Sequence, residues 1–85
     1  MLIRFTQGAR KHRIGQGSAR YVMARTTPTG VVTEQGNPAW RYVGRDERER
    51  ELEIIAVELD DTPEGDAALL VIHVMPTDLR RREQT

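Results

Sequence analysis

The stretch from Ala67 to Pro76, AALLVIHVMP, constrains the fold more than any other part of the chain. It carries no charge, although 31% of the residues in the chain are charged. Val71, Ile72 and Val74 are β-branched, which favours a strand over a helix. A short apolar run between a loop-like DDTPEGD and a proline is typical of a strand covered on both faces. We therefore predict a central strand here, with Ile72 and Val74 on its more uniformly apolar face, packed against a helix over 18–25.

Length and composition set the size of the core. The 85 residues fit a single domain, 1–85, with one modest core. Only 38% of the residues are apolar, so a partner protein or a homo-oligomer could supply part of the stability. The absence of cysteine excludes disulfides and thiolate metal sites. We expect no signal peptide and no membrane span, because no long apolar run is present, and a cytoplasmic location.

The net charge of zero hides a strong segregation of charge along the chain. Residues 1–33 contain six basic residues and no acid, whereas residues 34–79 contain twelve acids against four arginines. The tail, 80–85, is basic again. Almost all the basic residues are arginine, which favours bidentate contacts to phosphate or carboxylate, although a bias in codon usage would give the same composition.

The order of apolar and turn-forming residues predicts an α+β fold. We expect a small antiparallel sheet of four to five strands arranged as a meander, two short N-terminal helices on one face, and a short C-terminal helical tail. Ser18 is the predicted N-cap of the second helix, and its apolar stripe is Ala19, Val22 and Met23. The expected order is strand 1–6 (an edge strand), helix 7–13, helix 18–25, strand 31–33, strand 39–45, strand 51–59, strand 68–75 and tail 77–84.

The densest candidate site is the basic run Arg10, Lys11, His12 and Arg13. Clustered cations bind nucleic-acid phosphates, and cleavage of a phosphodiester also needs a group that titrates near neutral pH, such as His12. The same run is also typical of a solvated helix face. Both interpretations stay open.

His73 is the second candidate, because it is the only polar side chain in the predicted central strand. It is either a hydrogen-bonded core residue or an acid or base at a sheet cleft. Arg80, in the tail, either holds phosphate or keeps the tail soluble. Trp40 and Tyr42, on one face of their strand, either stack on a base or supply core area. No spacing predicts a metal site or a cofactor, since His12 and His73 have no converging carboxylate partner in the sequence pattern.

The segment ARKHRIGQGSARYVM resembles the start of BrnT-type toxins and of a related bacterial family of uncharacterised domains. The matching residues are Lys11, His12, Ile14, Ala19, Val22 and Met23. RYVGRDERERELEIIAVEL followed by LLVIHVMPTDLRRRE is similar to the hairpin, strand and arginine-rich tail of the same proteins. The resemblance implies membership of the RelE-like group of ribonuclease toxins: a small antiparallel sheet with helices, neutralised by an antitoxin.

Two functions follow as hypotheses. The first is a ribonuclease toxin of a bacterial type II toxin–antitoxin system that cleaves RNA without a metal, and therefore has RNA and an antitoxin as partners. In it, His12 or His73 acts as the acid or base, and Arg10, Lys11, Arg13 and Arg80 bind phosphate. The alternative is a protein- or RNA-binding module on the same fold, without catalysis.

Overall fold

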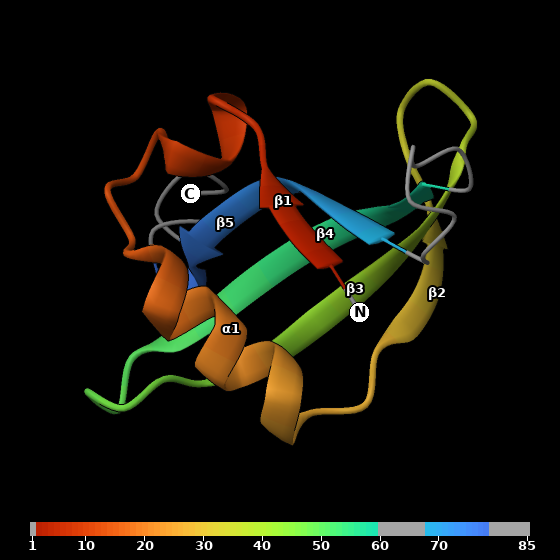
Figure 1. Ribbon diagram of the computed structural model, residues 1–85. Coiled ribbons are helices and arrows are strands. Elements are labelled where there is room, and N and C mark those ends of the chain that lie inside the picture. Colours follow the sequence, from red (N-terminus) through yellow and green to blue (C-terminus); the bar gives the residue numbers. More distant parts are fainter. Residues whose placement is uncertain (1, 60–67, 79–85) are drawn as a thin grey trace.

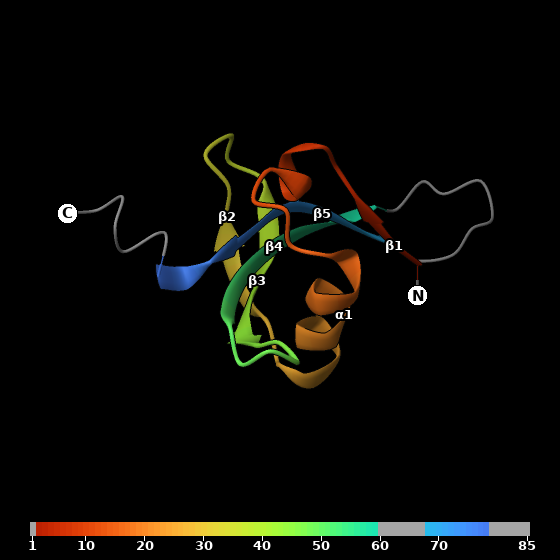
Figure 2. The same ribbon diagram turned by 90° about the vertical axis from the view of Figure 1, so that its left-hand side faces the viewer.

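The computed structural model describes residues 2–59 and 68–78, and a five-stranded mixed sheet dominates it (Figure 1). The strand order is β1-β5-β4-β3-β2, so that β1 and β2 form the two edges. One α-helix, α1, and one 3-10 turn, η1, lie on the same side of this sheet (Figure 2). The elements are β1 (Leu2–Phe5), η1 (Gly8–Arg10), α1 (Gln16–Arg25), β2 (Thr29–Val32), β3 (Pro38–Arg45), β4 (Glu51–Leu59) and β5 (Ala68–Pro76).

The prediction of an antiparallel meander is wrong for the sheet as a whole. β2, β3, β4 and β5 do follow one another as antiparallel neighbours, but β1 pairs with β5 in parallel. The meander begins with β2 at one edge of the sheet and proceeds strand by strand through β3 and β4 to β5. β5 then lies beside β1, which forms the other edge. Because this pairing joins strands that are far apart in the sequence, the pattern of apolar and turn-forming residues does not predict it.

The prediction of a first helix over 7–13 is also wrong. The chain makes only a 3-10 turn over Gly8–Arg10, whose Ala9 amide donates to Thr6 Oγ1 (3.2 Å). Arg13 has a φ of 57°, in the left-handed region that ends helical geometry. With so few apolar residues, the segment cannot bury a stripe that would extend the turn into a helix.

The second predicted helix is present and starts two residues before Ser18. Gly15 occupies the N-cap, and Ser18 is buried within the first turns of α1. The predicted stripe of Ala19, Val22 and Met23 is buried against the sheet, as expected. The helix ends at Arg25, and the sequence Thr26, Thr27 and Pro28 then leads the chain into β2.

Of the predicted C-terminal helical tail, only Thr77 and Asp78 fall within the described ranges 2–59 and 68–78; these two residues are helical but form no separate element, and residues 79–85 lie outside these ranges. In the part of the chain that the structure describes, the elements are one helix, one 3-10 turn and a mixed sheet, which corrects the predicted two-helix antiparallel fold.

A β-bulge in β5 changes which of its residues face the core. Ala56 pairs with Val71 and Ile55 pairs with His73, so Ile72 is the extra residue opposite that step. An extra residue shifts the alternation of every side chain beyond it. As a result Val71 and Val74 are both buried in the core cluster beneath α1 and η1, whereas Ile72 and His73 are half-buried and line the opposite face. The predicted placement of Ile72 against the helix is wrong, and that of Val74 is right.

The core fills the space between α1, η1 and the sheet. Its largest fully buried side chains are Val22 from α1, Leu52 and Ile54 from β4, and Val71 and Val74 from β5. β5 is an interior strand as predicted, although β4 is the middle strand of the five. No helix of the described residues covers the other face of the sheet, which carries the candidate site.

Candidate functional site

Three ionisable side chains from adjacent strands meet on the face opposite α1. Arg41 Nε on β3 donates to Glu53 Oε2 on β4 at 2.6 Å, and His73 Nε2 on β5 lies 3.2 Å from Glu53 Oε1. The register explains the meeting, because Arg41 and His73 both pair with Ile55, two residues from Glu53 on the same face. We call this group the Arg41–Glu53–His73 cluster.

The three members of the cluster differ sharply in exposure. The Glu53 side chain is only 3% exposed, whereas Arg41 is 40% and His73 35% exposed. A carboxylate buried in this way needs charged or hydrogen-bonding partners to offset its lost hydration. Glu53 therefore contacts an arginine and a histidine whose side chains remain partly exposed, although the Nε2 atom of His73 is itself buried.

A hollow of about 500 Å³ surrounds the accessible side of the cluster. Apolar side chains from three strands line it together with Arg41, Glu53 and His73, and the turn between β2 and β3 contributes Thr33, Glu34 and Gln35. The apolar residues are Val31, Val32, Ile55, Ile72 and Met75. The site thus combines a cation, an imidazole and an apolar wall, which suits a ligand with an anionic part and a flat or apolar part.

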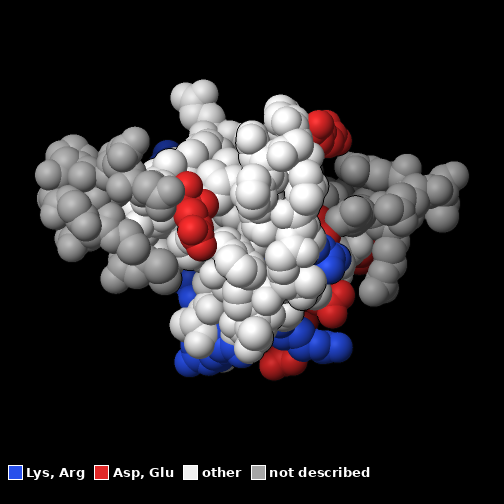
Figure 3. Space-filling model, turned by 90° about the vertical axis from the view of Figure 1, so that its right-hand side faces the viewer, with Lys and Arg blue, Asp and Glu red and all other residues white. Residues whose placement is uncertain are grey.

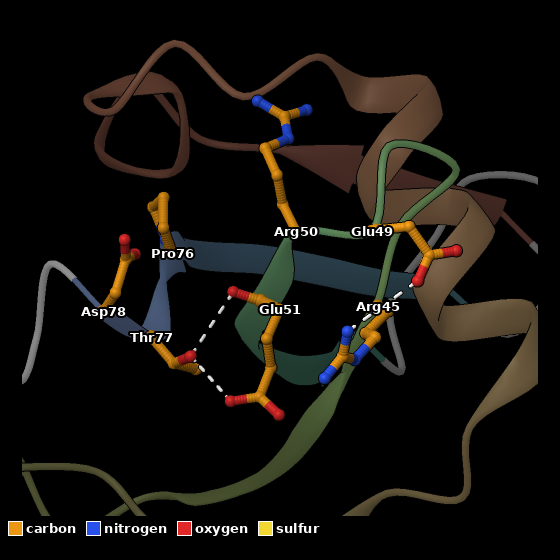
Figure 4. Close-up of a pocket in the computed structure, with 7 residues that line it drawn as sticks. All are labelled: Arg45, Glu49, Arg50, Glu51, Pro76, Thr77 and Asp78. Carbon is orange, nitrogen blue, oxygen red and sulfur yellow. Dashed lines mark hydrogen bonds and ion pairs between the residues drawn. The ribbon is translucent and has the colours of Figure 1, made fainter.

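A second hollow, of about 490 Å³, lies at the end of the sheet where β4 begins and β5 ends (Figure 4). Its charged groups are already paired at short range. Thr77 Oγ1 donates to Glu51 Oε1 (2.6 Å), and Arg45 Nη1 lies 3.7 Å from Glu49 Oε2. The guanidinium of Arg50 binds Asp46 (2.7 Å). The cations of both hollows face carboxylates of the same chain, but only the Arg41–Glu53–His73 cluster adds an imidazole, since no histidine is among the described residues that line this second hollow.

Asp46 organises the β3–β4 hairpin rather than a ligand site. Its buried carboxylate accepts bonds from the Arg48 and Arg50 amides and from Arg50 Nε (2.9, 2.9 and 2.8 Å). Burial opposes ionisation of this carboxyl, but the bonds from Arg50 and Arg48 outweigh it and lower the pKa of Asp46. Glu47, in the same hairpin, accepts a hydrogen bond at Oε1 from Ser18 Oγ of α1 (2.5 Å). This bond lowers the pKa of Glu47. The hairpin is thereby fastened to α1.

The structure separates the two histidines predicted as candidates. His73 belongs to the cluster, whereas half-buried His12 follows η1 on the side of the sheet that α1 covers. Within residues 2–59 and 68–78, no hydrogen bond or ion pair joins His12 to the cluster. Arg10, Lys11 and Arg13 are exposed around the same turn as His12, and Arg80 lies outside the described residues.

Sequence reasoning missed Arg41 and Glu53, although it placed both on predicted strands. A usable signal was present: Glu53 interrupts the apolar run of β4 between two buried residues, Leu52 and Ile54. A carboxylate at such a position must find partners on neighbouring strands. Of the two aromatic candidates, Tyr42 is buried and supplies core area, whereas Trp40 is exposed; stacking on a base stays a prediction. Burial, helped by the charge of Glu58, raises the pKa of Tyr42.

Searches for related proteins do not extend this description. No protein-family model, curated protein or solved structure matches the chain. Among the described residues, no three His, Asp or Glu side chains are grouped so that they could hold a metal ion. No helix in this part of the chain is long and apolar enough to cross a bilayer.

Proposed function

We propose that this chain is a ribonuclease toxin that cleaves RNA at the Arg41–Glu53–His73 cluster, with the 2′-hydroxyl of the substrate as the nucleophile. One observation carries the proposal. His73 is accessible from the hollow while its Nε2 lies 3.2 Å from the buried carboxylate of Glu53. An imidazole oriented by a carboxylate is a common arrangement for proton transfer near neutral pH.

The proposed reaction needs only groups of the chain and of RNA. His73, in its neutral form, takes the proton of the 2′-hydroxyl at Nδ1, because Nε2 is buried against Glu53, and the 2′-oxygen attacks the adjacent phosphorus. The bond between phosphorus and the 5′-oxygen breaks, and that oxygen receives a proton from the imidazolium. The products are a 2′,3′-cyclic phosphate and a 5′-hydroxyl. Arg41 binds the phosphate oxygens, on which negative charge increases in the transition state.

Glu53 acts in this proposal as a positioning residue. It is too deeply buried to touch RNA, but it contacts both groups that do. Its charge favours the imidazolium formed during the reaction and fixes the orientation of the ring. The apolar side chains of Ile55, Ile72 and Met75 offer a wall for an unstacked base, as single-stranded RNA requires.

The basic turn at Arg10, Lys11 and Arg13 supports the same substrate class. Its exposed cations lie outside the hollow and would contact phosphates further along an RNA strand. His12 is not given a role in proton transfer, because it lies apart from the cluster. Binding of phosphate by Arg80 stays a prediction. In keeping with the resemblance to BrnT-type toxins, we place the activity in the bacterial cytoplasm, under the control of an antitoxin protein.

Induced expression in bacteria tests this function. We expect the wild-type chain to arrest growth and to fragment cellular RNA, and we expect His73→Ala to abolish both effects. His12→Ala is the matched control and should remain toxic. Intact RNA in cells that accumulate folded wild-type protein would contradict the proposal. If the purified protein were then retained on RNA in a salt-dependent way, the alternative of a binding module without catalysis would hold.

A further inference from the structure

The chain holds the indole of Trp40 at two opposite edges of the ring. The side chain points to the side of the sheet that carries α1, because its cross-strand partner Ala56 belongs to the core cluster. Its Nε1 donates to Glu58 Oε1 on β4 (2.9 Å), and its Cζ3 lies 3.9 Å from where a Cβ at Gly30 on β2 would be. Trp40 is nevertheless 37% exposed. Since both edges have contacts, the ring surface that solvent reaches belongs largely to a face.

A hollow of about 440 Å³ adjoins this ring, and we call it the Trp40–Glu58 hollow. Apolar residues of β2 and β3, among them Val32 and Pro38, line it together with Trp40 and Glu58. Val32 is 72% exposed, so α1 leaves this part of the sheet uncovered. Figure 3 looks onto the side of the molecule on which β2 lies and shows a broad uncharged surface with charged groups along its margins.

The charge of the hollow favours a cationic ligand. Glu58 is the one charged side chain among the described residues that line it. Within residues 2–59 and 68–78, no ion pair includes Glu58, whereas the carboxylates of Asp46 and Glu53 each bind an arginine. The bond from Trp40 uses Oε1 and leaves Oε2 for a ligand. The face of an indole attracts cations, and the carboxylate repels a phosphate, so a nucleic-acid strand fits this hollow poorly.

We propose that the Trp40–Glu58 hollow binds an arginine side chain of a partner protein. The planar guanidinium stacks on the exposed face of the indole and donates hydrogen bonds to Glu58 at the edge of the ring. A guanidinium suits this pair of groups better than an ammonium does, because it is flat and less strongly hydrated. The apolar side chain of Val32 contacts the methylene stem, which favours a side chain over a small free cation.

Binding of small probes tests this proposal. The chain contains a single tryptophan, so its fluorescence and its one indole N–H signal report on this hollow alone. The probe is arginine with an acetylated amino group and an amidated carboxyl group. Its control is citrulline capped in the same way, which has nearly the same shape but no charge. We expect the arginine probe to shift the indole signal saturably and the citrulline probe to bind about tenfold more weakly. Methylguanidinium, which lacks the stem, should also bind more weakly.

One pair of matched variants locates the binding. Glu58→Gln keeps an oxygen that can accept the Trp40 bond and removes the charge. We expect it to weaken binding of the arginine probe about fivefold. Glu34→Gln makes the same change at an exposed carboxylate that lines the other hollow, beside the Arg41–Glu53–His73 cluster, and should bind as the wild type does.

Several outcomes would overturn the proposal. They are an indole signal that the arginine probe leaves unchanged, equal binding of the citrulline probe, or equal binding by a folded Glu58→Gln variant. Methylguanidinium that bound as tightly as capped arginine would assign the hollow to a free cation instead of a side chain. A stronger response to adenosine than to arginine would make the ring a surface for base stacking. None of these readouts depends on RNA cleavage, so this proposal and the proposed function can fail independently.

Discussion

Glu53 and His73 contact each other across the β4–β5 ladder, with 3.2 Å between Glu53 Oε1 and His73 Nε2, because of the bulge at Ile72. In a regular strand, His73 would share a face with Leu69 and Val71, which are buried in the core beneath α1. The extra residue turns His73 to the opposite face, beside Glu53. Bulges often aim a side chain in this way next to functional sites.

Replacing Glu53 should affect both stability and activity. Glu53→Gln keeps the shape of the side chain but removes the charge that faces Arg41 and His73. We expect it to lower the free energy of unfolding by roughly 1–3 kcal/mol, the usual range for a disrupted buried polar contact. Urea unfolding measures the change. The control is Glu58→Gln on the opposite face, which is exposed and should stay within about 0.5 kcal/mol. Equal effects of the two variants would mean that Glu53 is not the buried centre of the cluster.

The bulge can be tested with one substitution made at two isoleucines. Ile54 is fully buried in the core, whereas Ile72 is half-buried on the other face. We expect Ile54→Ala to cost about 2–5 kcal/mol, as for other core isoleucines. Ile72→Ala leaves no enclosed cavity and should cost about 1 kcal/mol. If thermal or urea unfolding showed Ile72→Ala to be the more damaging change, the register of β5 would be wrong.

The hairpin carboxylate gives stability a defined pH dependence. Because the folded chain lowers the pKa of Asp46, its contribution is complete above the unfolded pKa, about 3.9, and is lost as pH falls through the lower folded value. Asp46→Asn should therefore cost roughly 1–3 kcal/mol at neutral pH. The difference from wild type should shrink below about pH 4.

Unfolding by urea between neutral and acidic pH measures this difference. Glu49→Gln serves as the control, because its ion pair with Arg45 in the same hairpin is exposed and should contribute less than about 0.5 kcal/mol. A gap between Asp46→Asn and wild type that stayed constant down to acidic pH would contradict the lowered pKa.

Gly44 on β3 lies close to the C-terminal end of α1. A Cβ at this position would lie 2.5 Å from Thr26 Cγ2 and 3.4 Å from Val22 Cγ1. We expect Gly44→Ala to destabilise the fold by about 1–3 kcal/mol, since the helix must shift to make room. Gly17→Ala, in α1 and without a neighbour within 4 Å, should instead stabilise by about 0.5–1 kcal/mol. Calorimetric melting of both variants shows whether the signs are opposite.

Local patterns predicted the strands well and their arrangement less well. The apolar run of β5, the alternation in β3 and the stripe of α1 each follow from neighbouring residues, so periodicity finds them. The parallel pairing of β1 with β5 and the bulge at Ile72 depend on contacts between distant parts of the chain. For the same reason His73 could be proposed from the sequence, whereas its partners Arg41 and Glu53 could not, because only the register brings the three together.

Cleavage of a short single-stranded RNA by the purified chain tests the central claim most directly. We expect the wild-type protein to release fragments ending in 2′,3′-cyclic phosphate, and to leave the same sequence uncut when every 2′-hydroxyl is replaced by hydrogen. His73→Ala and Arg41→Ala should each lower the rate by about 100-fold or more, while His12→Ala should not. Cleavage that persists in folded His73→Ala, or on the 2′-deoxy strand, would contradict the assignment of this site.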